Sequence, residues 1–343
     1  MNGATRRITI KDVAERAHVS IGTVSRLLNN SGYVGKETAE RIKKAIKDLE
    51  YIPNAGARSI NNKHSAIIGV TVPQINNPFL ADLVVQIESH LYEKNYSVMF
   101  CNAQYRAKKA SEFIDDLIMY NADGLILVST DINDEGLIKK VSNYLSAVSI
   151  GHAVSGFDSI SLDDFESAYT MTKYLIDHNH YKIAFIGFNR NANQTMERVN
   201  GYKAAMLDMG LPLNQEYILE SDAGRGDAYK LTSRLIKLDE RPTAIIAIND
   251  FYAMDAYEAI NDFGLKVGQD ISVMGFDNIS VAKFLYPSLT TVNCNTATMS
   301  KCAVQMLNER IKGEYTGKPR NIQLRTEIIY RNSVALLNRR KFG

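Results

Sequence analysis

Short apolar runs alternate with amphipathic helical stretches from Ala66 to Cys294, and this alternation constrains the fold more than any other feature of the chain. Such a pattern is typical of parallel sheets joined by crossover helices. Because it occurs in two successive sets, it predicts two similar α/β lobes with a cleft between them. The first set predicts strands at 66–72, 97–102, 124–129 and 147–150, and the second at 182–186, 217–220, 244–248 and 271–275, with a return segment at 289–294.

The length and composition agree with a globular chain of more than one domain. With 343 residues, 45% of them hydrophobic, the chain exceeds one typical domain and can form two or three cores. No stretch approaches the roughly 18 apolar residues of a membrane span, so we expect a cytoplasmic protein that contacts no membrane. Three widely spaced cysteines without nearby histidines predict reduced thiols and no metal site.

The charge is unevenly distributed along the chain. Residues 1–60 carry eleven Lys or Arg against six Asp or Glu, a net charge of +5, while the whole chain carries +2, which leaves −3 for the remainder. A small basic head on a mildly acidic body is typical of a module that binds a polyanion. A solvated helix face would give the same charge pattern, so charge alone leaves both interpretations open.

The basic head has the pattern of three short helices. The first is predicted over 11–17 and ends at His18, a residue type that tolerates the left-handed conformation. The second is predicted over 21–28, and the Ser20 hydroxyl is expected to cap it. Two helices joined by so short a turn predict a helix-turn-helix, with a third helix over 36–50 packed behind.

The second helix is expected to read DNA bases. Val24 and Leu27 have the spacing of core residues, which leaves the opposite side of the helix free. Arg26 on that side can donate two hydrogen bonds to a guanine edge, and Ile21 can contact a thymine methyl group. The residues predicted to contact DNA from this helix and its ends are Ser20, Ile21, Gly22, Thr23, Arg26 and Asn29.

The run KDVAERAHVSIGTVSRLLNN, together with YIPNAGARSI after the third helix, closely resembles the DNA-binding head of the LacI/GalR family of transcriptional regulators. The resemblance implies a helix-turn-helix domain over 8–52 and a hinge helix over 53–62. The hinge helix would form in the minor groove, where Ala57 and Ile60 contact DNA and Ile60 inserts into a base step. It further implies that a homodimer binds a pseudo-palindromic double-stranded operator.

The resemblance continues to about residue 333 and implies an effector-binding body over 63–333. This body looks like a type I periplasmic sugar-binding protein crossed by three connecting strands. The N-terminal lobe is expected at about 63–162 and 289–320, and the C-terminal lobe at about 163–288 and 321–333. The tail after 333 is too short for a tetramerising coiled coil of several heptads, which favours a dimer.

Ligands of open α/β sheets bind beyond the carboxyl ends of the strands, so the loops there are expected to line the cleft. On the resemblance, the motifs ERVNGY, AIND and GFDN supply Arg198, Asn249 and Asp277. An arginine, an amide and a carboxylate beside an aromatic ring suit a polyhydroxylated ligand, so the effector is expected to be a sugar. The predicted ligand-binding residues are Asn77, Phe79, Ser129 and His152 on one wall and Arg198, Asp222, Asn249, Phe251 and Asp277 on the other.

Alternatives remain for several of these residues and for other signals. Phe79 also fits a core position, His152 a loop cap, and Asp222 is chosen from its place after a strand alone. The pairs 115–116 and 163–164 are both Asp-Asp and are expected to be solvated charges rather than metal ligands. No nucleophile set or phosphate loop is recognisable, so neither an enzyme nor a cofactor is expected.

The leading interpretation is a repressor whose affinity for DNA is controlled by a small molecule in the cleft. Whether the molecule releases or recruits DNA stays open. A solute-binding module for transport would explain the body alone, but the basic head argues against it. An enzyme with an α/β core is the third alternative, and it lacks a supporting motif.

Overall fold

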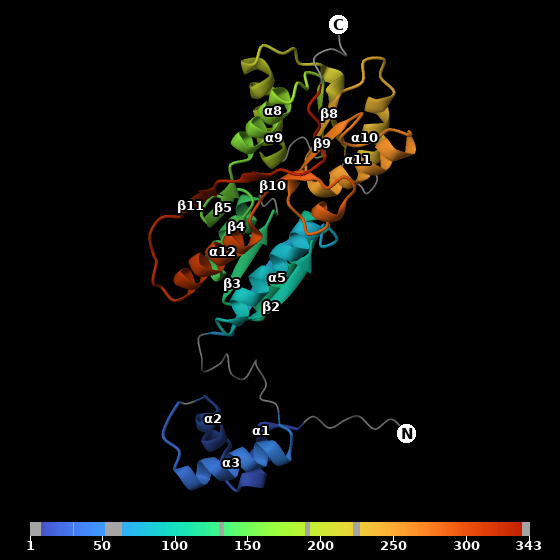
Figure 1. Cartoon of the computed structure of the whole chain (residues 1–343). Helices are drawn as coiled ribbons and strands as arrows, with labels where there is room; N and C mark the ends of the chain where they lie inside the picture. The colour runs from blue at the N-terminus through green and yellow to red at the C-terminus, as the bar shows by residue number, and fades with distance from the viewer. Residues whose placement is uncertain are drawn as a thin grey trace.

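The computed structural model describes residues 8–29, 31–51, 64–129, 134–188, 193–221 and 227–337. A helical head and two α/β lobes are visible in Figure 1. Three predicted site residues, Ala57, Ile60 and Asp222, lie outside the described residues. Within the described part, no helix is both long and apolar enough to cross a membrane.

The head contains three helices, α1 (Ile10–Ala17), α2 (Ile21–Asn29) and α3 (Lys36–Asp48). The predicted turn between the first two is confirmed, because His18 adopts the left-handed conformation with φ 53° and ψ 49°. The predicted cap is also confirmed, since the Ser20 hydroxyl accepts from the Thr23 amide at 3.2 Å. A small core joins the helices and consists of Val13, Ala14, Ala17, Val24, Ile42, Ala45 and Tyr51.

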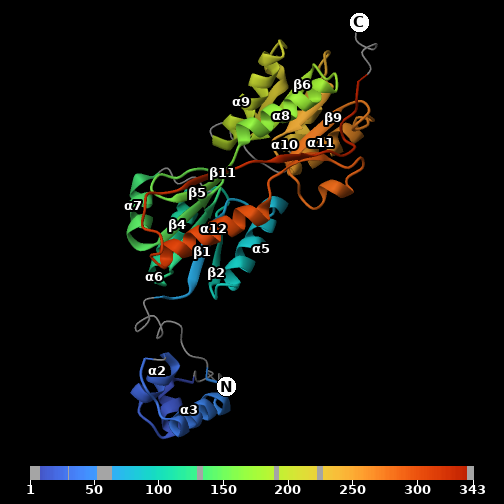
Figure 2. The same cartoon turned by 60° about the vertical axis from the view of Figure 1, so that its left-hand side comes forward.

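The first lobe is built on a parallel six-stranded sheet in the order β11-β5-β4-β3-β1-β2. Helices α5 and α12 cover one face and helices α6 and α7 the other (Figure 2). The strands are β1 (Ile67–Val72), β2 (Ser97–Asn102), β3 (Gly124–Val128), β4 (Ser146–Ile150), β5 (Asp158–Leu162) and β11 (Asn321–Leu324), and the helices are α5 (Pro78–Tyr92), α6 (Ala107–Met119), α7 (Glu135–Tyr144) and α12 (Thr296–Ile311).

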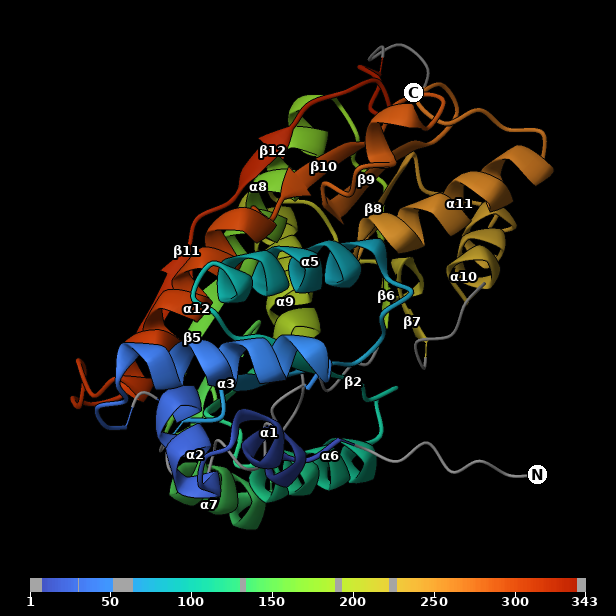
Figure 3. The ribbon, with the colours of Figure 1, turned by 90° about the horizontal axis from the view of Figure 1, so that it is seen from below.

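The second lobe repeats this architecture with the strand order β12-β10-β9-β8-β6-β7, which can be followed in Figure 3. Only β12 is antiparallel to its neighbour among the described strands. Helices α8 and α9 pack together, and so do α10 and α11. The strands are β6 (Ile183–Phe188), β7 (Ile218–Ser221), β8 (Ala244–Ala247), β9 (Ser272–Asp277), β10 (Thr290–Asn293) and β12 (Glu327–Ile329), and the helices are α8 (Asp164–Asp177), α9 (Asn193–Asp208), α10 (Asp227–Ile236) and α11 (Asp250–Asp262).

The two-lobed α/β body predicted from the sequence is confirmed, but two of the expected lobe boundaries are wrong. The N-terminal lobe does not begin its second part at 289, because β10 pairs with β9 of the second lobe. The C-terminal lobe does not resume at 321, because β11 pairs with β5 and covers the open edge of the first sheet. The chain therefore crosses between the lobes after β5, after β10 and after β11.

Candidate DNA-reading helix and effector cavity

Helix α2 presents a free surface of small polar and apolar side chains. Ile21 is 47% exposed, Gly22 and Arg26 are also exposed, and Val24 on the opposite side is fully buried. The Ser20 and Thr23 hydroxyls are 2.9 Å apart, so they hydrogen-bond to each other at the start of the helix. The Asn29 side chain lies outside the described part of the structure. The arrangement suits insertion of the helix N-terminal half into a DNA major groove.

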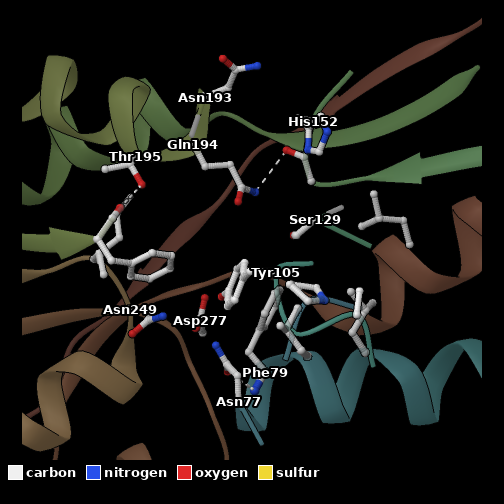
Figure 4. A pocket seen from close by; sticks show the side chains of 18 of the residues that line it. Asn77, Phe79, Tyr105, Ser129, His152, Asn193, Gln194, Thr195, Asn249 and Asp277 are labelled. Carbon is white, nitrogen blue, oxygen red and sulfur yellow. Dashed lines mark hydrogen bonds between the residues drawn. The ribbon is translucent and has the colours of Figure 1, made fainter. Parts of the chain in front are cut away.

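A cavity of about 270 Å³ lies between the two lobes, at the carboxyl ends of the strands (Figure 4). Seven predicted ligand-binding residues line it, namely Asn77, Phe79, Ser129, His152, Arg198, Asn249 and Asp277. Phe251 lies in the first turn of α11 and is not part of the lining, and Asp222 lies outside the described residues. The lining residues that the sequence did not single out include Tyr105, Arg106, Phe188, Asn193, Gln194 and Thr195.

Local hydrogen bonds and one unusual backbone conformation fix the segments that form the first-lobe wall of the cavity. Asn77 caps α5 with its side-chain oxygen, which accepts from the Phe79 amide at 3.0 Å. Ser129 directly follows β3 and has a φ of 43°, an unusual conformation for a residue other than glycine. The Ser149 hydroxyl donates to the His152 carbonyl at 2.8 Å and thereby fixes the loop after β4.

Aromatic rings from both lobes border the cavity. Phe79 and Tyr105 come from the first lobe (Figure 4), and Phe188 comes from the second. The ring of Phe188 packs against that of Tyr252 with centroids 5.3 Å apart, which fixes its position. Rings of this kind offer flat apolar surface for the C–H faces of a sugar or for a planar ligand. The cavity lining therefore combines aromatic rings with polar side chains.

The second-lobe wall contains a buried ion pair. Arg198 is 7% exposed, and its Nε donates to Asp164 Oδ1 at 2.7 Å. Its Nη1 donates to the Ile248 carbonyl at 2.5 Å, and the guanidinium lies 3.9 Å from the centroid of the Phe276 ring. The expectation that Asp164 is a solvated charge is wrong, because the carboxylate lies at the start of α8 where the two lobes meet and is buried against Arg198.

Asp277 lines the cavity and has one unpartnered oxygen. The side chain is 8% exposed, and its buried Oδ2 has no hydrogen-bond partner among the described residues. Its Oδ1 lies 3.8 Å from the Cys294 thiol. Burial, together with the nearby charge of Asp250, raises the pKa of Asp277 well above its usual range. Asp277 therefore gives the second-lobe wall a carboxyl group with one unsatisfied oxygen.

Asn249 and Asp250 follow β8 and begin α11. The Asn249 side-chain oxygen caps the helix by accepting from the Tyr252 amide at 2.8 Å, which leaves its NH₂ group as the donor toward a ligand. Asp250 is fully buried and accepts from the Ile279 amide at 2.9 Å and the Thr291 hydroxyl at 2.5 Å. Burial raises the pKa of Asp250 to about 7. Asp250 thus ties α11 to the loop after β9.

One side chain bridges the two lobes at the cavity. Gln194 in α9 donates from Nε2 to the Gly151 carbonyl of the first lobe at 3.1 Å (Figure 4). Gly151 has a φ of 110°, and a Cβ there would lie 2.8 Å from the Ser129 hydroxyl, so glycine is required. The bridge couples the position of α9 to the loop after β4.

Comparison with protein families gives two matches along the chain. Residues 9–54 match the bacterial regulatory proteins of the lacI family, and residues 172–334 match the periplasmic binding protein-like domain. Curated relatives include the HTH-type transcriptional repressor PurR of Actinobacillus pleuropneumoniae serotype 3, 32% identical over 96% of this chain and 99% of the relative. The repressor of the same name from Aliivibrio fischeri is 34% identical over 97% of this chain and 99% of the relative.

Solved structures with the same architecture are numerous. A complex of the transcriptional regulator CelR with cellobiose is 26% identical, with a TM-score of 0.71, and covers 95% of this chain and 100% of its own. A regulator from Enterococcus faecium with bound ribose is 25% identical, with a TM-score of 0.73, over 79% of this chain and 100% of its own. The lac repressor dimer on its operator shares the fold at 24% identity and a TM-score of 0.83, over 96% and 100%.

Proposed function

The chain belongs to the LacI family of DNA-binding transcriptional repressors, and from this premise we propose that a small polyhydroxylated molecule in the interlobe cavity controls its binding to an operator. The relatives are repressors and not enzymes, so the protein is a regulator. The effector, its chemical class and the contacting residues are our proposal.

The observation that carries the effector proposal is the cavity of about 270 Å³ between the two lobes, which Arg198, Asn249 and Asp277 line. The Asn249 NH₂ group is available as a donor, and the aromatic rings of Phe79, Tyr105 and Phe188 border the cavity. A sugar ring matches this arrangement, because its hydroxyls donate and accept while its C–H faces pack on aromatic surfaces. The cellobiose and ribose complexes of the two related regulators support this class of ligand.

Thermal unfolding of the purified chain against free sugars, nucleosides and purine bases tests the effector class. A ligand at 100 times its Kd stabilises the folded protein by about 2.7 kcal/mol. We expect a shift with a sugar that disappears in Asp277→Ala and persists in Glu258→Gln, whose side chain is exposed on α11. A shift confined to bases or nucleosides would contradict the sugar assignment and leave the DNA-binding role intact.

For the operator, we propose that Ser20, Ile21, Gly22, Thr23, Arg26 and Asn29 contact the major groove. The exposed surface of α2 supports this assignment. Selection from random DNA with the full chain tests it, and we expect enrichment of a two-fold-symmetric site. If the selection enriched only an asymmetric site, the proposed dimeric readout would be wrong.

We also propose that two copies of the chain pair through an apolar face formed by Val85, Tyr92, Phe100, Phe284 and Tyr286. These large side chains are exposed on α5, on β2 and on the loop that contains the short helix η2 (Ala282–Phe284). β2 is the edge strand of its sheet. Exposed apolar patches of this kind mark interaction sites. A second copy is the expected occupant because the related lac repressor binds its operator as a dimer.

A further inference from the structure

We propose that a groove at the C-terminal ends of helices α10 and α11 is a docking site for an acidic segment of another protein. The site is independent of the effector cavity and of the DNA-reading helix. This hollow, the α10 groove, has a volume of about 610 Å³, and its lining includes Tyr229, Lys230, Arg234, Lys237 and Phe263.

The α10 groove is separate from the interlobe cavity. Asn249 at the start of α11 lines the cavity, whereas Phe263, which lines the groove, follows the last residue of the same helix. The 13 residues of α11 place these two ends about 20 Å apart. Helices α10 and α11 pack together and lie side by side in Figure 1 and Figure 3. A ligand in the cavity therefore leaves the groove free.

The described lining of the α10 groove includes three cationic side chains. Lys230 and Arg234 are one turn apart on α10, and Lys237 directly follows the helix, so the three share one face. All three residues are exposed. Lys230 Nζ lies 3.6 Å from Asp227 Oδ1, whereas neither Arg234 nor Lys237 forms an ion pair among the described residues. The charges of Arg234 and Lys237 are therefore available to a partner.

Aromatic surface lies beside these cations. Phe263 is 40% exposed, and the Lys237 ammonium lies 5.5 Å from the centroid of its ring. The Tyr229 hydroxyl donates to Asp262 Oδ2 at 3.0 Å, which restrains the second ring of the lining. Exposed apolar surface next to cations suits a segment that carries both an apolar side chain and carboxylates.

The α10 groove is a cationic patch on a mildly acidic body. The lining that the structure describes contains no Asp or Glu. Two carboxylates contact lining residues, and both are engaged, because Asp227 pairs with Lys230 and Asp262 accepts from Tyr229. Residues 61–343 as a whole carry a net charge of −3, since residues 1–60 carry +5 and the chain +2. The groove is thus locally complementary in charge to an acidic segment.

The exposure of these cations favours a protein segment over a small anion or a nucleic acid. A single ion gains little from cations that stay in water, because exposed ion pairs are individually weak. A segment with several carboxylates and an apolar side chain can contact Arg234, Lys237 and the Phe263 ring together. A DNA duplex would extend beyond the patch onto the acidic remainder of the body. A short segment meets mainly the local charge, because charges more than about 10 Å away are screened at about 0.1 M salt.

Selection from a phage-displayed library of random peptides on the immobilised full chain tests the proposal. Excess random-sequence duplex DNA is present to occupy the basic head. We expect the selected peptides to contain several Asp or Glu residues next to an aromatic or aliphatic residue. A selection that enriched no acidic peptide would overturn the proposal.

A tryptophan at position 263 then shows where a selected peptide binds. The chain contains no tryptophan, so Phe263→Trp supplies a fluorescence reporter inside the α10 groove. We expect a selected peptide to change the emission of this reporter saturably. The same peptide with Asn and Gln in place of Asp and Glu should bind at least tenfold more weakly. An unchanged emission, or displacement of the peptide from the reporter by duplex DNA, would contradict a groove for acidic protein segments.

Charge reversal separates the α10 groove from the other basic surfaces of the chain. Arg234→Glu combined with Lys237→Glu should weaken binding of the selected peptide at least tenfold, measured by calorimetric titration. Lys139→Glu combined with Lys301→Glu makes the same change of charge at exposed residues of α7 and α12 and should leave the affinity within twofold. An equal loss of affinity in the two double variants, or a loss in neither, would overturn the proposal.

Discussion

The Arg198–Asp164 pair illustrates how a buried charge constrains this protein at the scale of single residues. Removing one partner of a buried pair leaves the other charge uncompensated, at a cost of about 3–5 kcal/mol. We therefore expect Asp164→Ala to lower the free energy of unfolding of the body by that amount, measured by urea denaturation. Asp115→Ala is the matched control, because Asp115 pairs with Lys140 on the surface, where ion pairs contribute about 0–1 kcal/mol. Equal effects of the two substitutions would contradict the burial argument.

His180 gives the body a dependence on pH that the sequence does not reveal. The ring is fully buried, with Nδ1 3.0 Å from the Thr243 hydroxyl and Nε2 3.0 Å from both the Ala335 carbonyl and the Ser272 hydroxyl. Burial lowers the pKa of His180 to about 4, from 6.5 for the free side chain. Between about pH 6.5 and pH 4, His180 is therefore protonated in the unfolded chain and neutral in the folded chain. The contribution of His180 to the free energy of unfolding is fully present above pH 6.5 and is lost as the pH drops toward 4.

We expect this single group to remove about 3 kcal/mol of stability between pH 7.5 and pH 4, using 1.36 kcal/mol for each unit of pKa difference. Urea denaturation of the wild type and of His180→Gln across this range measures the effect. The variant should be less stable at pH 7.5 and should lose less stability on acidification. Parallel pH profiles for the two proteins would show that His180 does not titrate in this way.

At the same scale, the sequence placed part of the cavity correctly and missed part of it for identifiable reasons. Residues at the carboxyl ends of strands, such as Ser129 after β3 and Asp277 at the end of β9, line the cavity because these ends of parallel strands lie at one edge of their sheet. The same rule applied to β2 would have pointed to Tyr105. Gln194 lies beyond the loop after β6, so only the three-dimensional path of α9 brings it to the cavity.

Among the elements, α2 has the most direct functional test. A bidentate arginine contact is worth about 1–3 kcal/mol of discrimination between bases. Arg26→Ala should therefore weaken binding to the selected operator and flatten the preference at one position of each half-site, measured by fluorescence anisotropy with single-base operator variants. Lys47→Ala is the control, because Lys47 is exposed on α3 and a phosphate contact there would change affinity for all sequences alike. An unchanged preference in Arg26→Ala would remove Arg26 from the base readers.

Strands with buried residues were predictable from their apolar runs, whereas β11 and β12 were not. All eight predicted strands and the return segment at 289–294 occur within two residues of their expected ends. β11 and β12 contain four and three residues, none of them buried, so they lack the apolar run of the other strands and were missed. β5 was also missed, because DSISL places polar side chains at buried positions, including Asp158, which is held by Arg310 and Arg320. The two wrong lobe boundaries concern β10 and β11, because the sequence does not reveal which sheet each of them joins.

At the scale of the whole molecule, the apolar face formed by Val85, Tyr92, Phe100, Phe284 and Tyr286 makes the dimer testable. Tyr286 is 95% exposed and Phe284 is 75% exposed, so neither supports the core of its own chain. We expect Tyr286→Asp to shift the protein toward monomer in analytical ultracentrifugation and to weaken operator binding, because two linked heads bind more tightly than one. Tyr144→Asp is the control, since Tyr144 is exposed on α7, away from this face. A dimer that survives Tyr286→Asp and a Phe284→Asp variant would place the interface elsewhere.

Control of DNA by the cavity requires that the two lobes have more than one arrangement and that the effector prefers one of them. The three interlobe crossings and the Gln194–Gly151 hydrogen bond allow a change at the cavity to alter the relation between the lobes. Coupling of this kind is reciprocal, so the factor by which effector changes operator affinity equals the factor by which operator changes effector affinity. A coupling of about 1–3 kcal/mol corresponds to a factor of about 5–150 in each of the two affinities.

We expect titrations with and without operator to give equal factors. Gln194→Ala should reduce both factors together and should leave the operator affinity measured without effector within a few-fold of the wild type. Factors that differ would mean that the sugar acts at a second site or changes the oligomeric state.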